Sequence, residues 1–154
     1  MPTQTITPPA KRKIGQNIFH AVYPHSFDFR IELPFSDALD FIRQMGTYNE
    51  FEPGYVIDSL ERIDQLIPRS FHGEGSLHNG ERDYRLSIGR NPSPIIYIER
   101  RESSLFSDCR NWLTEQTMKS ICLDMELCGR ADDAYYRVSE DGTSRKITFR
   151  FWWD

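Results

Sequence analysis

The sequence predicts an α+β fold: a single domain in which a mostly antiparallel sheet of about seven strands carries three helices on one face. The chain of 154 residues has the size of one domain, and 38% hydrophobic and 13% aromatic residues suffice for a packed core. Several segments alternate apolar and polar residues, as half-buried strands do, and others repeat apolar residues every three or four positions. Hairpin-like pairs of strands outnumber strand–helix–strand units, and the expected order is ββααβββαββ.

The first fifteen residues are expected to form a flexible basic arm, which precedes a single domain over residues 16–154. The arm contains Pro8-Pro9, which resists helix formation, and the cluster Lys11, Arg12 and Lys13, with no acidic residue. Three positive charges supply little affinity for nucleic acid at physiological salt, so the arm alone does not indicate a function.

Two strands and a helix are expected next. Residues 16–24 and 27–33 are strand-like, and the second segment alternates strictly. Its apolar positions are Phe27, Phe29, Ile31 and Leu33. Pro34 should end this strand, Ser36 should cap the N-terminus of the helix, and Gly46 should stop it.

A second helix should begin near Pro53 and end at Pro68, since its apolar residues keep helical spacing. Residues 69–101 are strand-like, and Asn79-Gly80 is a strong signal for a tight hairpin turn. The segment IIYIERR, which follows the turn-forming residues 91–94, is expected to be a central strand.

A long helix is expected from Ser103 or Ser104 to Gly129, and a last hairpin should turn at residues 140–143. The buried stripe of this helix is expected to be Cys109, Trp112, Leu113, Met118, Ile121, Cys122 and Met125. In the final strand, one face should carry Ile147, Phe149, Phe151 and Trp153, and the other face Thr148, Arg150 and Trp152.

Charge is unevenly distributed along the chain. The net charge is −4, but positions 36–68, which are expected to be helical, hold seven acidic and two basic residues. The hairpin regions are neutral to slightly basic. The predicted helical layer is therefore acidic, and it is one candidate surface for a basic partner, although such acids often only form the solvated side of amphipathic helices.

Simple features disfavour a membrane-spanning protein and a secreted protein. No apolar run is long enough for a membrane span, and the N-terminus lacks the apolar stretch of a secretory signal. Three cysteines without a CxxC pair favour free thiols in a reducing compartment, which predicts a cytoplasmic protein.

A metal site is one candidate for chemistry. The hairpin FHGEGSLHNGERD places His72, His78 and Asp83 within twelve residues, together with two glutamates, and divalent metals accept imidazole and carboxylate ligands together. In an extended strand, however, His72 and His78 lie too far apart to share one ion unless the chain bends at a glycine. A polar hairpin that faces water is the simpler interpretation.

The sheet face turned away from the helices is a second candidate. If the apolar positions face the helices, the opposite face combines arginines with aromatic residues. The residues expected there are Arg30, Arg85, Tyr135, Arg137, Arg150 and Trp152. This composition is typical of protein-interface hot spots and also of platforms for single-stranded nucleic acid. A solvated face with Arg–carboxylate pairs would have the same composition.

Few features of the sequence support covalent catalysis by a cysteine or serine nucleophile. Cys109 and Cys122 fall on the expected apolar stripe, and Cys128 lies near the C-terminal end of the same helix, where a thiolate is not favoured. The sequence contains no GxSxG, Walker A or GxGxxG motif. Paired catalytic carboxylates cannot be recognised in one sequence, so enzyme activity stays open.

The expected function is that of a small, soluble, non-catalytic interaction protein that needs no cofactor. It would bind a partner protein as an inhibitor, an immunity or anti-defence factor, or an accessory subunit. The alternative is a metal-dependent hydrolase that uses His72, His78 and Asp83. The third hypothesis is a single-stranded nucleic-acid binder that uses the arginine and aromatic face of the sheet. No membrane partner is expected.

Overall fold

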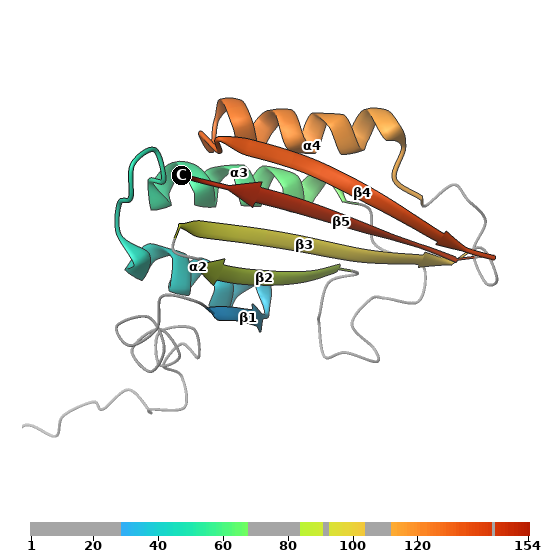
Figure 1. The fold of residues 1–154 in the computed structure, drawn as a ribbon, viewed down its shortest axis with the longest axis horizontal. Helices are drawn as coiled ribbons and strands as arrows, with labels where there is room; N and C mark the ends of the chain where they lie inside the picture. Colours follow the sequence, from blue (N-terminus) through green and yellow to red (C-terminus); the bar gives the residue numbers. More distant parts are fainter. Residues whose placement is uncertain (1–28, 68–83, 91–92, 104–111, 143) are drawn as a thin grey trace, which may run out of the picture.

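The computed structural model describes residues 29–67, 84–90, 93–103, 112–142 and 144–154, which form a five-stranded antiparallel sheet and three helices (Figure 1). The strands are β1 (Phe29–Leu33), β2 (Tyr84–Arg90), β3 (Pro94–Ser103), β4 (Asp133–Asp141) and β5 (Ser144–Trp152). The helices are α2 (Phe35–Met45), α3 (Pro53–Leu66) and α4 (Glu115–Leu127). The strand order across the sheet is β1-β2-β3-β5-β4, with β3 in the centre and β4 at an edge. The predicted α+β class is confirmed.

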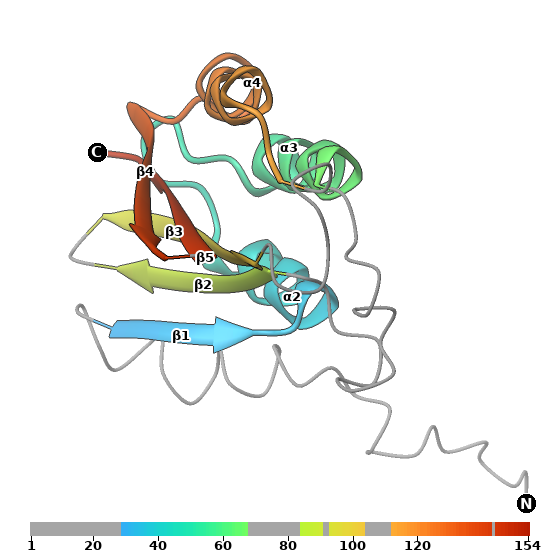
Figure 2. The ribbon, with the colours of Figure 1, turned by 90° about the vertical axis from the view of Figure 1, so that its right-hand side faces the viewer.

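The three helices lie on the same side of the sheet (Figure 2). Every second side chain of a strand points to the same face of the sheet. The helices cover the face to which the apolar residues of the alternating strands point. Phe149, Phe151 and Trp153 at the C-terminal end are completely buried in this layer. Trp153 packs edge-on against Phe51 and donates from its indole Nε1 to the carbonyl of Gly129, which ties the end of the chain to the turn after α4.

The register of the sheet follows from this alternation. Ile96 of β3 lies opposite both Ile88 of β2 and Phe151 of β5, so the central positions of the core stack across three strands. A slip of one residue would turn every one of these side chains to the other face. The expected strands at 84–90, 94–101 and in the last hairpin are therefore confirmed.

Two expected strand regions lie outside the described residues. These are residues 16–24 and the hairpin around Asn79-Gly80, and the basic arm 1–15 lies outside them too. The structure describes five strands where about seven were expected.

The start of α2 differs from the prediction. Pro34 occupies the N-cap position without a side-chain hydrogen bond, and Ser36 lies inside the first turn. The backbone of Pro34 is extended, with φ −56° and ψ 155°, and proline has no side-chain oxygen that could cap the free amides of the helix. Gly46 ends the helix with φ 74°, as expected.

The start of α4 was predicted wrongly. Residues up to Ser103 belong to β3, and α4 begins only at Glu115, where the Thr114 hydroxyl accepts a hydrogen bond from the amide of Thr117. This N-cap satisfies one of the free amides at the helix start. The buried stripe itself is confirmed at Met118, Ile121, Cys122 and Met125. Among the described helices, none is both long and apolar enough to cross a bilayer.

Candidate functional site

The face of the sheet turned away from α2, α3 and α4, here called the outer face, carries all six residues predicted from the sequence. They come from four strands, and the register places them at positions that alternate with the core residues: Arg30, Arg85, Tyr135, Arg137, Arg150 and Trp152. The prediction of a shared face is confirmed as a matter of geometry.

One row of side chains crosses the whole outer face. Glu32, Ser87, Tyr97, Arg150 and Tyr135 are successive cross-strand neighbours from β1 to β4. Cross-strand neighbours on the same face have Cβ atoms only about 5 Å apart, so long side chains in such a row contact one another. The two tyrosines therefore flank Arg150 on either side.

Arg30 reaches into this row from β1. Its guanidinium carbon lies 3.9 Å from the centre of the Tyr97 ring, within the range of a cation–π interaction. Gly89, opposite Arg30 on β2, leaves the space that the Arg30 side chain crosses. A Cβ at Gly89 would lie 2.9 Å from the carbonyl oxygen of Phe29, so this close approach of β1 to β2 requires glycine.

Arg150 is held from several sides. Its guanidinium carbon lies 5.7 Å from the ring centre of Tyr135 and 5.9 Å from that of Trp152, and Asp133 lies 4.0 Å away. Partial burial lowers the pKa of Arg150, but hydrogen bonds with Tyr97 and Tyr135 outweigh this effect, and the net shift is upward. The guanidinium therefore stays charged, while 27% of the side chain remains exposed to solvent.

The outer face and the helices carry opposite charge. The strand positions of the outer face hold six basic and four acidic residues, whereas α2, α3 and α4 together hold eight acidic and three basic residues. Arg85 is largely open to solvent, with 68% of its side chain exposed and a 3.5 Å contact to Glu32. A distribution of this kind orients an approaching charged partner.

Several further residues of this face were not named from the sequence. Tyr97, Arg101 and Lys146 lie on it, and all three were detectable from the same alternation in β3 and β5. Tyr97 is the most consequential omission, because it is the ring under Arg30 and a neighbour of Arg150.

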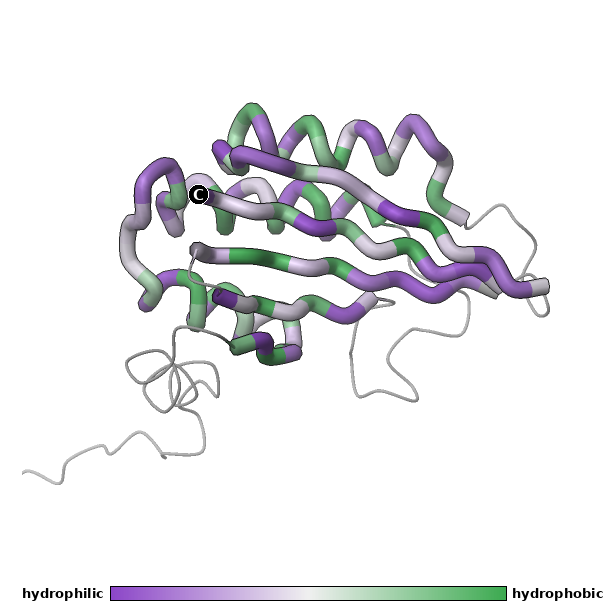
Figure 3. The backbone as a smooth tube through the Cα atoms, in the orientation of Figure 1, coloured by the Kyte–Doolittle hydropathy of each residue, from purple (hydrophilic) through white to green (hydrophobic). Residues whose placement is uncertain are grey.

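A second arginine cluster lies on the helix side of the sheet, at the polar ends of β3 and β5 that are purple in Figure 3. Glu102 is buried and accepts hydrogen bonds from Arg100, from Arg145 and from the amide of Leu113. Arg145 also donates to the carbonyl of Leu113 and stacks on Trp112, 4.7 Å from the ring centre. These bonds fasten the segment before α4 to the sheet.

The remaining predicted sites are not brought together by the described residues. His72, His78 and Asp83 lie outside them, and within the described ranges no group of three His, Cys, Asp or Glu side chains could hold a metal ion. Cys109 also lies outside. Burial raises the pKa of Cys122 to about 12, so this thiol is protonated and not nucleophilic at neutral pH.

Comparison with known proteins adds no further constraint. No protein-family model matches this chain, and no curated protein or solved structure is detectably similar to it.

Proposed function

We propose that this protein is a non-catalytic binding protein whose outer face binds an acidic surface of a partner protein. The observation that carries the proposal is the arrangement of Arg30 and Arg150 over the rings of Tyr97, Tyr135 and Trp152, on the basic side of a molecule whose helices are acidic.

The residue types support a protein partner. Arginine, tyrosine and tryptophan dominate the energetics of protein interfaces. Tyrosine and tryptophan offer a large contact area with few rotatable bonds to immobilise, and arginine offers a planar charged group that stacks and forms paired hydrogen bonds. A guanidinium that already rests on an aromatic ring loses little further freedom when it binds a carboxylate. Opposite charge on the helices disfavours docking of the same partner in the wrong orientation.

The biological role that fits such a protein is an inhibitor, an immunity or anti-defence factor, or an accessory subunit. A compact domain with a polar, charged interface suits an association that is specific and reversible. A cytoplasmic location, which the thiols favoured at the sequence level, belongs to the same proposal.

The test is affinity capture from the lysate of the native cells, after nuclease treatment. The Arg150→Glu/Trp152→Ala variant should lose a stoichiometric acidic protein that the native chain retains. Arg43→Glu on α2 is the control, because Arg43 is also an exposed arginine paired with one acid, Asp40. A partner retained equally by both variants would move the interface to the helices or the arm and overturn the proposal.

A single-stranded nucleic acid is the second candidate ligand. The basic charge of the outer face, with Tyr135 and Trp152 beside Arg150, favours it. Against it, the ring of Tyr97 is covered by Arg30, so a base would have to displace the guanidinium in order to stack. An oligothymidylate should therefore bind weakly at low salt or not at all, and tight binding with a steep salt dependence would favour this candidate instead.

A further inference from the structure

The two edges of the sheet differ in length and in what surrounds them. β1 has five residues and is followed directly by α2. β4 has nine residues, and among the described strands only β5 pairs with it. An exposed edge of this length presents a row of unpaired amides and carbonyls to another strand, which natural proteins usually protect.

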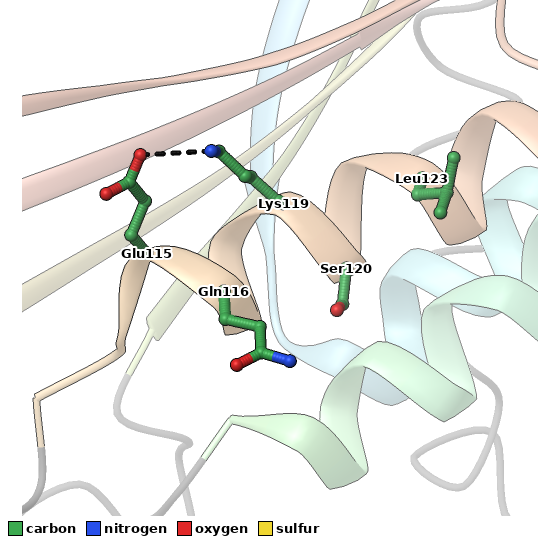
Figure 4. A pocket seen from close by; sticks show the side chains of 5 residues that line it. All are labelled: Glu115, Gln116, Lys119, Ser120 and Leu123. Atoms are coloured by element: carbon green, nitrogen blue, oxygen red, sulfur yellow. Dashed lines mark ion pairs between the residues drawn. The ribbon is translucent and has the colours of Figure 1, made fainter.

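Apolar side chains lie next to the β4 edge. A groove of about 290 Å³ runs between α4 and β4, and it is lined by Lys119, Cys122, Leu123, Glu126, Ala134, Tyr135 and Tyr136. Leu123 and Leu127, one turn apart on α4, are 54% and 70% exposed. Figure 4 shows that the preceding turns on this side of α4 carry polar residues, including the Glu115–Lys119 ion pair. The apolar patch is thus confined to the C-terminal half of α4.

The charges of β4 are complementary to a second copy of β4 in one register. If two β4 strands pair antiparallel about a twofold axis at Tyr135, Asp133 of each copy lies opposite Arg137 of the other. An axis at Arg137 would instead place two arginines opposite each other and Asp133 opposite Asp141. The favoured axis also lies at the level of Leu123, since Leu123 and Tyr135 line the same groove.

We propose that the protein forms a homodimer through this edge, in which residues 133–137 of two β4 strands pair and join the two sheets into one continuous sheet. The twofold axis at Tyr135 brings the C-terminal halves of the two α4 helices together, so that Leu123 and Leu127 of both copies become buried. Main-chain hydrogen bonds between the edges supply affinity, and the two Asp133–Arg137 pairs fix the register. The dimer interface uses the β4 edge and the C-terminal half of α4, whereas the proposed acidic partner binds the outer face. Tyr135 and Arg137 lie where the two surfaces meet, and dimerisation doubles the area of the outer face.

Sedimentation equilibrium over a dilution series tests the proposal. The native chain should dimerise, and Leu123→Glu/Leu127→Glu should raise the dissociation constant at least about tenfold. Leu66→Glu is the matched control, because Leu66 is an exposed leucine (45%) on α3, outside the residues that line the groove, and it should leave the dimer intact. Circular dichroism would establish that all variants remain folded.

A charge exchange then tests the register. Arg137→Asp and Asp133→Arg should each weaken the dimer, because each places like charges opposite one another, and the double variant Asp133→Arg/Arg137→Asp should restore it. A native chain that remains monomeric at every concentration overturns the proposal. So does a dimer that is insensitive to the leucine substitutions, or a double variant no stronger than the single ones. None of these readouts depends on the acidic partner, so this proposal and the proposed function can fail separately.

Discussion

The two faces of the sheet carry arginine clusters that differ in what the guanidinium groups contact. On the helix side, Arg100 and Arg145 bind the buried carboxylate of Glu102. On the outer face, Arg30 and Arg150 lie mainly against aromatic rings, and Arg150 has its nearest carboxylate at 4.0 Å. The first cluster is bound to a buried carboxylate and to the Leu113 carbonyl, and it fastens the segment before α4 to the sheet. The second keeps charged donors positioned toward solvent, which is the property that a binding surface needs.

Removing one aromatic ring from the helix side should have the largest effect on stability. Phe149 is completely buried between Tyr136 and Phe151, so Phe149→Ala should lower the free energy of unfolding by about 3–5 kcal/mol. Its neighbour Thr148 points to the outer face, and Thr148→Ala should cost less than about 1 kcal/mol. Urea unfolding of both variants measures the difference, and equal costs would mean that the assignment of the two faces is wrong.

The two kinds of ionic contact can be compared through two glutamates. Glu102→Ala leaves two arginines in the interior without this carboxylate and should destabilise the protein by about 3–5 kcal/mol. Glu32 on the outer face is exposed and contacts Arg85 at 3.5 Å, so Glu32→Ala should cost less than about 1 kcal/mol. Thermal unfolding checks this pair, and a Glu102 variant as stable as the Glu32 variant would show that the inner cluster is not structural.

Replacing Gly89 or Gly54 by alanine should change stability in opposite directions. A methyl group at Gly89 would meet the Phe29 carbonyl oxygen at 2.9 Å, so Gly89→Ala should force β1 away from β2 and cost about 1–3 kcal/mol. Gly54 in the first turn of α3 has free space around it, and Gly54→Ala should stabilise the protein by about 0.4–1 kcal/mol. Denaturation midpoints measure both signs, and a neutral Gly89→Ala would contradict the close packing of β1.

The smallest expected effect is a change in the pH dependence of stability, caused by an ion pair between two helices. Both carboxylate oxygens of Asp124 on α4 accept hydrogen bonds from Arg62 on α3. Burial raises the pKa of Asp124, but the hydrogen bonds from Arg62 and Ser59 lower it by more. The net shift therefore takes this pKa below its ordinary value of 3.8. Stabilisation by this pair is therefore fully present well above pH 3.8 and is lost as the pH falls through the folded-state pKa.

Since Arg62 is about half exposed, the pair should contribute less than about 1 kcal/mol. Asp124→Asn and Arg62→Gln should remove the same part of the acid-induced loss of stability, because either change breaks the same pair. Unfolding curves recorded between neutral and acidic pH measure it. An unaltered profile in both variants would mean that the pair does not form in solution.

Alternation made most of the sheet predictable from the sequence. In β2 and in the last strand, β5, apolar and polar residues alternate, as at Tyr84, Leu86 and Ile88 of β2. This alternation predicts both that the segment is a strand and which of its faces is buried. The same reasoning grouped the six outer-face residues, although it could not show that Arg30 would reach Tyr97 from β1, since that contact depends on the register between β1, β2 and β3.

The inner arginine cluster could not be predicted in this way. The run Glu99–Ser103 is entirely polar, and the sequence predicts that the strand ends at Arg101 and that a helix begins at Ser103 or Ser104. In the structure β3 continues to Ser103, and the partners of the buried Glu102 include Arg145 and Leu113, far along the chain. The burial of polar residues at core positions can be predicted only when their distant partners are known.

If the outer face is the surface that meets the partner, site-specific photo-crosslinking in the native cells should show the contact. The photoreactive side chain would replace Arg85 on the outer face or Arg43 on α2, which are 68% and 53% exposed. We expect a discrete adduct with an acidic protein from position 85 and none from position 43. An adduct from position 43 alone, or with nucleic acid at position 85, would contradict binding of an acidic protein by the outer face.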